Sequence, residues 1–541
     1  MTDDQMIFVN KVEHALRDLG AKIISFECKN VLPTWDFSFI GEGMEWPLRI
    51  QTYGWNIYEL PAIYWRVKTP IWGWPHISLS GDVCISDREG LEYDPEDILG
   101  VLDWLLRKTV RMLEQNHSMP EIARKELFAD ELEGYLRNCG AKAVAIDEPL
   151  DTSKALYAEV ELVKKGKMNL VYPVVRRINQ GDTQITNCQQ QRLGLVDLSI
   201  HQLPDLRSEW DVVWWNSFIE RLSTSQRDIA TSAKYRGLLL RVPNEYGYAL
   251  FLLYWGVRPS KKGAIYFLQR QDRDYLIQRT GGEPSPRHAI VVGCGSVGSR
   301  VAEHLALSGI EKLTLVDGDT FSADNLGRHI LGKQSISKPK VDELAQLFRE
   351  RMPGIDVESK AMHVQPLLAK GALATADAIV LATGNSVLER SIVRRAFQEG
   401  WPSLIVSTSV EAGGLGGHAI AMRPGVRGCL DCLYIDPDTQ QPLAGLRTAL
   451  IAPDQRITRQ LTGCGAFTPY SSIDATRTAL MAAERVLANT PVYSRWAGEG
   501  TLAKAESIQP SDTYHALRAG RIAADLDSSV FAQPRCPCCG V

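Results

Sequence analysis

Short strand-like apolar runs alternate with helical stretches in the second half of the chain. Residues 289–292 (Ala-Ile-Val-Val) form a run too short for a helix, and residues 313–316 form another. Between them, apolar side chains recur at a helical spacing that puts Val301 and Leu305 on one side. This pattern predicts a strand–helix–strand unit with parallel strands, followed by a third strand at 378–381.

The first part of the chain has a different pattern. Residues 4–19 repeat apolar side chains at a helical spacing and end at Gly20, which predicts an amphipathic helix. Short β-type runs separated by turn residues follow, and they indicate an antiparallel meander. Asp94 as a cap and Pro95 at the first position then predict the start of a long helix, with a further helix at about 120–138.

The domain organisation follows from these patterns. Residues 143–280 mix strand-like and helical runs without a repeat or a motif, which we interpret as a folded spacer. A Gly- and Pro-rich linker begins at residue 281. We therefore expect an α/β and α+β multidomain chain with an α+β domain at 1–142, a mixed domain at 143–280 and an α/β domain at 281–541. The length of 541 residues fits three or four domains of about 150 residues.

Composition narrows the class of protein. Apolar residues make up 45% and charged residues 23%, as in ordinary globular chains, and a net charge of −4 argues against nonspecific binding to nucleic acid or membranes. No apolar run approaches the length of a membrane span, and the acidic, helical start does not resemble a secretory signal. The 11 cysteines indicate thiol, metal or catalytic chemistry rather than a disulfide framework. We expect a cytoplasmic protein.

A glycine-rich turn joins the first strand of the α/β domain to its helix. Gly293, Gly295 and Gly298 form a GxGxxG motif, in which glycine permits a tight turn and a close approach of phosphate to the helix start. Asp317 follows about 20 residues later, where an acidic side chain meets a nucleotide ribose. Enzymes that bind NAD or FAD share this motif, so it does not define the nucleotide alone.

The residues after the second strand separate the alternatives. Asp319, Asn325, Arg328 and Lys340 supply carboxylates and cations around one nucleotide. An enzyme that adenylates a carboxylate needs such cations, because charge accumulates on the α-phosphate and on pyrophosphate. The ordered elements GxGxxG, DxD, NLxRH and KPK resemble the ThiF/MoeB and ubiquitin-activating superfamily, in which glutamine usually stands at the place of His329.

The resemblance spans roughly residues 285–541 and implies a Rossmann-like adenylating domain that uses ATP and Mg²⁺. Arg328 and Lys340 would act on the phosphates during catalysis. The family usually has an aspartate that helps to bind magnesium at the place of Gly384, so Asp319 or another carboxylate would hold the ion here, or adenylation is impaired. The nucleotide-binding residues implied are Gly293, Gly295, Gly298, Asp317, Asp319, Asn325, Arg328 and Lys340.

Cysteines suggest two further sites in this domain. The CxxC pairs Cys429/Cys432 and Cys536/Cys539 suit a closed, structural tetrahedral Zn²⁺ site that clips the chain end to its domain, the alternative being four unligated thiols. Spacing favours Cys539, although Cys538 could replace it. In ThiF-like proteins, a cysteine before a small-residue turn and a helix accepts the activated carboxylate, and Cys464 matches that place; the alternative is a packing cysteine.

The first 140 residues resemble a ubiquitin-conjugating enzyme in their order of a helix, a meander, a cysteine loop and helices. His76, Gly81 and Cys84 match the layout around that family's catalytic cysteine. Ile77-Ser78 replace a proline and an asparagine, so the asparagine that supports the thioester oxyanion is missing. Cys84 alone would fit a buried structural cysteine; beside an adenylating domain we expect it to be catalytic, with His76 bracing the loop.

The whole arrangement resembles bacterial fusion enzymes of antiphage cyclic-oligonucleotide signalling operons. That resemblance implies a homodimer that adenylates the C-terminal carboxylate of a protein, a cGAS-like nucleotidyltransferase. The acyl group would pass to Cys464, then to Cys84 and finally to an amine of a target protein. Two alternatives stay open. A sulfur-carrier adenylyltransferase would not need Cys84, and a nucleotide-binding scaffold without catalysis is permitted by Gly384.

Overall fold

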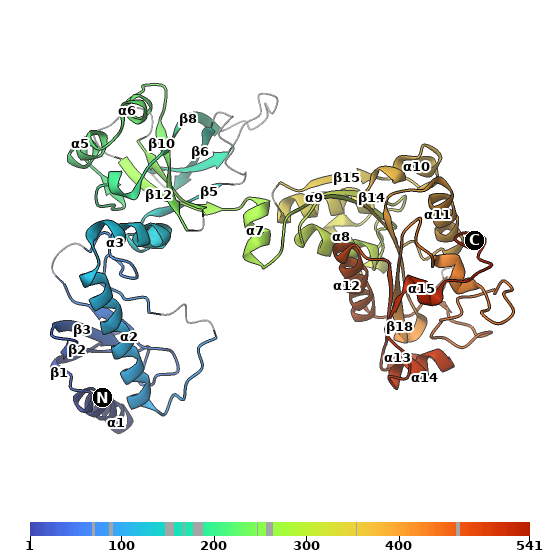
Figure 1. Cartoon of the computed structure of the whole chain (residues 1–541), viewed down its shortest axis with the longest axis horizontal. Helices are drawn as coiled ribbons and strands as arrows, with labels where there is room; N and C mark the ends of the chain where they lie inside the picture. The colour runs from blue at the N-terminus through green and yellow to red at the C-terminus, as the bar shows by residue number, and fades with distance from the viewer. Residues whose placement is uncertain are drawn as a thin grey trace. The chain divides into compact units, whose positions relative to one another are not determined.

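The computed structural model describes residues 1–67, 71–85, 90–146, 156–165, 168–176, 188–245, 247–255, 263–352, 354–460 and 466–540. The chain divides into two compact units, one comprising Met1–Ile146 and Leu150–Arg270 and the other extending from Gln271 to Val541 (Figure 1). The domain boundaries expected at residues 142 and 280 stay predictions. Within the described ranges, no helix combines the length and the apolar character needed to cross a membrane.

The first sheet has the predicted meander. Helix α1 (Asp3–Asp18) starts at a capping box of Thr2 and Gln5 and buries Val12 and Leu16. The four strands that follow pair antiparallel in chain order. Their bounds are β1 (Lys22–Lys29), β2 (Leu32–Ile40), β3 (Glu45–Gln51) and β4 (Ala62–Trp65).

Helix α2 (Ile98–Ser118) buries its apolar side in the same core as this sheet, with Leu105 fully buried. The helix begins later than predicted. Asp97 is its N-cap and accepts a hydrogen bond from a backbone N–H of the first turn at 2.9 Å. The prediction of Asp94 as the cap was wrong, because its carboxylate accepts the N–H of Glu96 in the turn before the helix.

The helical stretch expected at about 120–138 is interrupted. It consists of α3 (Glu121–Phe128) and α4 (Leu132–Asn138), joined by a 3-10 turn. Phe128, Leu132 and Leu136 are buried in the core of the second sheet. This segment therefore leads from α2, which packs in the core of the first sheet, to the core of the second sheet.

The second sheet closes into a ring. Its strands run in the order β11-β10-β8-β6-β7-β5-β12, β11 also pairs with β12, and β9 extends from β12. The closure was not predicted, because it requires the pairing of β5 with β12, which are distant in sequence. The elements are β5 (Lys142–Ile146), β6 (Leu156–Lys165), β7 (Met168–Arg176), β8 (Cys188–Asp197), β9 (Glu209–Trp210), α5 (Val212–Glu220), α6 (Thr224–Ala230), β10 (Gly237–Asn244), β11 (Gly247–Tyr254) and β12 (Gly263–Arg270).

The third sheet contains the predicted strand–helix–strand unit. Its order is β15-β14-β13-β16-β17-β18-β21-β22, with parallel pairing from β15 to β17 and antiparallel pairing beyond. The chain order reverses between β13 and β16, and ligands of open α/β sheets bind at such a point. The strands are β13 (Ser285–Val292), β14 (Ile310–Val316), β15 (Asp356–Lys360), β16 (Ala378–Leu381), β17 (Leu404–Val410), β18 (Gly416–Met422), β21 (Val492–Ala497) and β22 (Asp525–Asp527).

Helices cover both faces of the third sheet (Figure 1). Successive side chains of β13 point to opposite faces, so Ala289 and Val291 pack with α8, α9 and α12, whereas Ile290 and Val292 pack with α11. This explains why the strand reads as a continuous apolar run. The helices are α7 (Arg273–Arg279), α8 (Gly298–Leu307), α9 (Lys340–Arg351), α10 (Gln365–Ala369), α11 (Ser386–Glu399), α12 (Ser472–Ala488), α13 (Thr501–Ala505), α14 (Asp512–Arg518) and α15 (Ser528–Phe531).

Candidate functional site

The turn between β13 and α8 has three glycines with different roles. Gly293 has a φ of 87°, and a Cβ there would lie 2.6 Å from the carbonyl oxygen of Ala382 at the end of β16. A Cβ at Gly298 would collide with the carbonyl oxygen of Gly293. A Cβ at Gly295 would meet nothing within 4 Å. Packing therefore requires glycine at positions 293 and 298, whereas Gly295 leaves the backbone open to an approaching group.

Asp317 ties the end of β14 to this turn. Its Oδ2 accepts the N–H of Cys294 at 2.7 Å, and its Oδ1 accepts the N–H of Asp319 at 2.8 Å. Each carboxylate oxygen retains capacity for a second hydrogen bond. The structure therefore places Asp317 at the glycine turn, and its contact with a ribose stays a prediction.

Lys340 and Asp319 form an ion pair beside the turn. The Nζ of Lys340, the first residue of α9, lies 2.9 Å from Oδ2 of Asp319. The lysine side chain is 8% exposed, whereas the aspartate side chain is 66% exposed. A solvent-facing carboxylate thus fixes a nearly buried cation, and the candidate magnesium ligand lies next to the candidate phosphate ligand.

Tyr470 and Ser296, which no sequence signal singles out, connect Arg328 to the glycine turn. The guanidinium carbon of Arg328 lies 5.3 Å from the ring centre of Tyr470. The hydroxyl of Tyr470 lies 2.7 Å from Oγ of Ser296, inside the GxGxxG motif. Tyr470 stands just before α12, far along the chain, and carried no local signal; only the fold brings it to the turn.

Asn325 shapes the loop that carries Arg328. Its Oδ1 accepts the N–H of Ser322 at 3.1 Å, and its carbonyl oxygen accepts the N–H of Arg328 at 3.1 Å. These hydrogen bonds cap a short 3-10 helix. A direct contact between Asn325 and a nucleotide stays a prediction.

His329 stabilises the glycine turn through a hydrogen bond to its backbone. Its Nδ1 accepts the N–H of Leu331 at 3.1 Å, so Nε2 carries the proton and donates to the carbonyl oxygen of Cys294 at 2.8 Å. The side chain is buried, and desolvation lowers its pKa below the ordinary 6.5. A neutral donor at this position matches what glutamine would supply in the resembling family.

The end of β16 has no carboxylate at residue 384 itself. Gly384 has a φ of 67°, and a Cβ there would enter open space. The nearby Glu389 is buried and accepts hydrogen bonds from the Thr383 N–H at 3.0 Å and the Ser407 hydroxyl at 2.5 Å. Burial raises the pKa of Glu389, which makes it a poor substitute for an exposed magnesium ligand.

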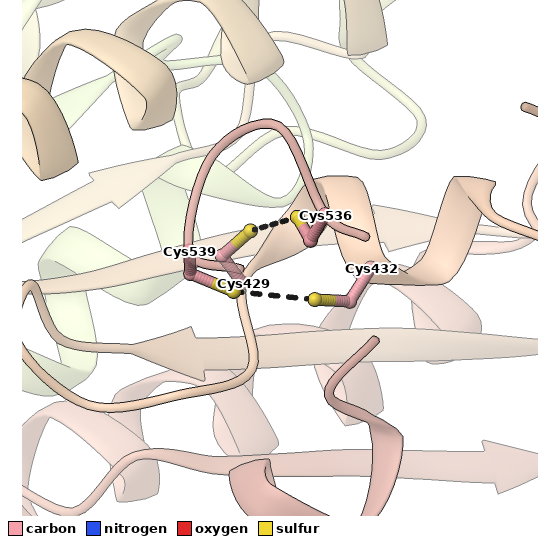
Figure 2. A group of neighbouring side chains, drawn as sticks. All are labelled: Cys429, Cys432, Cys536 and Cys539. Atoms are coloured by element: carbon pink, nitrogen blue, oxygen red, sulfur yellow. Dashed lines mark hydrogen bonds between the residues drawn. The ribbon is translucent and has the colours of Figure 1, made fainter. Parts of the chain in front are cut away.

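Four cysteine sulfurs gather at the end of the chain (Figure 2). The Sγ atoms of Cys429, Cys432, Cys536 and Cys539 all lie within 4.8 Å of one another. The pairs Cys429–Cys536 and Cys432–Cys539 are 3.5 Å and 3.3 Å apart. Tetrahedral zinc with Zn–S bonds of about 2.3 Å requires sulfurs about 3.8 Å apart, so the donor set and its spacing fit this ion. The group includes Cys539 rather than Cys538.

Asp431 stabilises the first CxxC segment. Its side chain is 2% exposed and accepts hydrogen bonds from Arg390, at 2.5 Å, and from Arg394, both on α11. The Arg390 guanidinium also lies 4.2 Å from the ring centre of Tyr434. These contacts fasten the cysteine segment to a helix that covers the sheet.

Cys464 lies outside the described residues. The strands β19 (Arg459–Gln460) and β20 (Ala466–Phe467) that flank it pair antiparallel. Its predicted role as the acceptor of the activated carboxylate therefore stays a prediction.

Cys84 stands on a compact loop of the first unit. Its N–H donates to the carbonyl oxygen of His76 at 2.8 Å, and Ile77 bridges Val83. Gly81 has a φ of 84°, and a Cβ there would collide with the carbonyl oxygen of Trp65. The structure brings His76 and Cys84 together across this loop, and Cys84 is exposed. Both residues line one cavity of about 520 Å³. Cys84 is therefore not a structural cysteine buried in the core.

Comparisons with known proteins match the C-terminal half. The model of the ThiF family matches residues 285–497. The sulfur carrier protein ThiS adenylyltransferase of Escherichia coli (strain K12) is 30% identical over 162 residues, which cover 30% of this chain and 62% of that protein. The ATP-dependent ubiquitin transferase-like protein Cap2 of Vibrio cholerae is 28% identical over 233 residues, covering 40% and 38%. The match thus spans less than two thirds of the length of these relatives.

A solved structure of Escherichia coli MccB with succinimide overlaps 49% of this chain and 69% of that chain. The sequences are 14% identical there, and the TM-score is 0.34.

Proposed function

We propose, from the ThiF-family domain in the C-terminal half, that the chain activates the C-terminal carboxylate of a protein with ATP. The convergence of a glycine turn, Arg328 and Lys340 at the carboxyl end of β13 carries this proposal. NAD- or FAD-dependent hydride transfer would not require the two cations. Carboxylate adenylation uses them, because negative charge moves from the α-phosphate to the departing pyrophosphate.

The residues present fit ATP and a magnesium ion. Gly293, Gly295 and Gly298 would offer the backbone of the turn to the phosphates, with Asp317 near the ribose. Arg328 and Lys340 would stabilise the developing charge, and Asp319 is the open carboxylate nearest to Lys340 that could hold Mg²⁺. In the reaction, a carboxylate oxygen forms a bond to the α-phosphorus as pyrophosphate leaves.

The later steps form a cysteine relay. The thiolate of Cys464 attacks the acyl-adenylate and releases AMP, Cys84 takes the acyl group by thioester exchange, and an amine of a target protein then forms an amide. Thioester exchange is nearly neutral in energy, so the cleavage of ATP drives the sequence. Both cysteines on one chain have an effective concentration of about a millimolar. Cap2 relatives are named ubiquitin transferase-like, which supports this reading of the relay.

The biological setting proposed is bacterial antiphage defence. The substrate would be a cGAS-like nucleotidyltransferase, the acceptor a cellular protein, and the enzyme a homodimer. The four-cysteine cluster would hold a structural Zn²⁺, with all of its ligand positions occupied by thiolates and no position left for substrate.

The experiment that tests the relay is the intact mass of Cys84→Ser and Cys464→Ser proteins, each expressed with its genomic neighbours. Serine converts a labile thioester into a more stable ester, so the captured protein can be weighed and identified. We expect an adduct on Cys84→Ser that requires ATP and Cys464. If neither variant carries an adduct while ATP is consumed, the two-cysteine relay is wrong.

A sulfur-carrier adenylyltransferase is the second candidate, because a ThiS adenylyltransferase is 30% identical over the matched segment. Such an enzyme would keep its activity when Cys84 is replaced. A Cys84→Ala variant that still forms thiocarboxylate from a carrier protein would favour this candidate over conjugation.

A further inference from the structure

His76 is held in an unusual backbone conformation by one carboxylate. Its φ of 61° lies in the left-handed region, which non-glycine residues adopt at a cost of about 1–2 kcal/mol. Glu131 binds it twice: Oε2 accepts the His76 N–H at 2.6 Å, and Oε1 lies 2.6 Å from Nδ1. Such strain persists only where the surroundings impose it, and it gathers at functional sites.

Other contacts already brace the loop. The Nδ2 of Asn116, a buried residue of α2, donates to the carbonyl oxygen of Pro75 at 3.0 Å. The His76 carbonyl oxygen accepts the Cys84 N–H, and Ile77 bridges Val83. The loop conformation therefore does not depend on the imidazole alone, although the sequence predicts a bracing role for His76.

Two cavities share His76 in their lining. One, of about 520 Å³, is lined by Cys84, Lys108 and Arg111. The other, of about 730 Å³, is lined by Asp130, Glu131 and Glu245. His76, Met112 and Gln115 line both. A thioester on Cys84 would thus have a histidine at its side, and beyond it an acidic cavity that suits a cationic group.

We propose that His76 is the general base for the transfer of the acyl group from Cys84 to a primary amine, and that Glu131 is its positioning residue. This inference rests on the proposed function. Because Nδ1 faces Glu131, Nε2 is on the other edge of the ring and is the nitrogen left to act in the cavity. A carboxylate on Nδ1 orients an imidazole and strengthens Nε2 as a base.

The step balances in atoms and charge. The amine lone pair attacks the thioester carbonyl carbon, and a C–N bond forms while Nε2 of His76 takes a proton from the nitrogen. The C–S bond then breaks, and the Cys84 sulfur leaves with the electron pair as a thiolate. The imidazolium returns its proton to that thiolate, which regenerates the neutral histidine and a free thiol.

Glu131 also sets the pH at which His76 can act. Its hydrogen bond and charge raise the pKa of His76 above the ordinary 6.5, against the effect of burial. Among the residues that the structure describes, the other charged groups that line the two cavities are Lys108, Arg111, Asp130 and Glu245. A base with a pKa near the working pH is the most effective one, since it combines the unprotonated form with affinity for the proton.

The test bypasses ATP and Cys464. The full-length protein is acylated at Cys84 by exchange with a peptide thioester of mercaptoethanesulfonate, with peptide mapping and Cys84→Ser as controls. The loaded protein is then mixed with Nα-acetyl-lysine amide, and discharge from Cys84 is timed from pH 6 to 9. The key variant is His76→Asn, because asparagine tolerates left-handed backbone and can still donate to Glu131. A Glu131→Gln variant tests the positioning residue.

We expect His76→Asn to load to the same extent and to discharge about 100-fold or more slowly. The ratio of wild-type to His76→Asn rates, which cancels the ionisation of the amine, should rise with pH through the raised pKa of His76 and then level off. When both proteins also carry Glu131→Gln, the midpoint of this rise should move to lower pH, because the carboxylate that raises the pKa of His76 is gone. A pH-independent ratio, a ratio that falls with pH, or a wild-type protein that does not load at Cys84 would each overturn the inference. Failure of ATP-dependent loading alone would overturn only the proposed function.

Discussion

The Nζ of Lys340 lies 2.9 Å from Oδ2 of Asp319, so the cation proposed for phosphate is held by the carboxylate proposed for magnesium. The lysine side chain is nearly buried, whereas the aspartate is open to solvent. A cation fixed before substrate arrives needs little reorganisation during the reaction. A metal ion bound by Asp319 would neutralise part of the negative charge of this carboxylate. The ion pair with Lys340 would then be weaker, and Lys340 would be more available to phosphate oxygens.

Replacing Lys340 should therefore impair chemistry more than folding. We expect Lys340→Ala to lower ATP–pyrophosphate exchange by about 100-fold or more, because one preorganised charge is lost from the transition state. Lys338→Ala is the matched control, since this neighbouring lysine is 51% exposed and pairs with Glu343 at 3.0 Å instead. Equal losses in the two variants would contradict the assigned role of Lys340.

The glycines of the turn give a second matched pair. A Cβ at Gly298 would collide with a backbone carbonyl, so we expect Gly298→Ala to lower the free energy of unfolding by on the order of 3 kcal/mol. A Cβ at Gly295 meets open space, so Gly295→Ala should fold like the wild type and lose affinity for ATP. Urea unfolding and nucleotide titration measure the two effects. Tight ATP binding by Gly295→Ala would place the phosphates elsewhere.

Local patterns predicted the elements that carry the nucleotide site, because each leaves its own signal in the sequence. The apolar run of β13, the following glycines and the acidic residue after β14 stand in order along the chain. Successive side chains of β13 then pack against helices on opposite faces, because the sheet is covered on both faces. Here sequence and structure agree closely.

Long-range contacts could not be predicted in the same way. Tyr470 reaches Ser296, and Glu131 reaches His76, only through the tertiary fold, and neither tyrosine nor glutamate stands in a recognisable motif. The Asp94 cap failed for a local reason, since a nearer aspartate, Asp97, competes for the helix start. A sequence can offer several plausible caps close together, and local patterns place a helix start only to within a few residues.

His329 should make stability depend on pH. Its folded pKa lies below 6.5, so the unfolded chain takes up a proton first as the pH falls. The stability that the neutral side chain contributes is present above pH 6.5 and is lost as the pH falls through 6.5 toward the folded pKa. Glutamine keeps a neutral donor, so His329→Gln should weaken the decline of the urea midpoint between pH 7.5 and about 5.5. If the urea midpoints of wild type and His329→Gln fell in parallel with pH, His329 would not contribute to the pH dependence of stability.

The four-cysteine cluster predicts the metal content of the protein. Purified protein should contain one zinc ion per chain by elemental mass spectrometry, since four sulfurs within 4.8 Å suit one tetrahedral ion. Cys539→Ser should lose the ion, whereas Cys538→Ser should keep it, because Cys539 rather than Cys538 belongs to the cluster. Retention of zinc by Cys539→Ser with loss in Cys538→Ser would reverse the assignment.

Removing the zinc should loosen the end of the chain before the rest of the sheet. The cluster joins the segment after β18 to the segment after α15, and structural zinc sites contribute on the order of 10 kcal/mol of apparent binding free energy. A chelator should therefore expose the C-terminal residues to protease and lower the melting temperature, and added Zn²⁺ should restore both. In Cys429→Ser the chelator should have little further effect, because the site is already broken. An unchanged melting temperature in metal-free wild-type protein would mean that packing alone, through Asp431 and its two arginines, holds this segment in place.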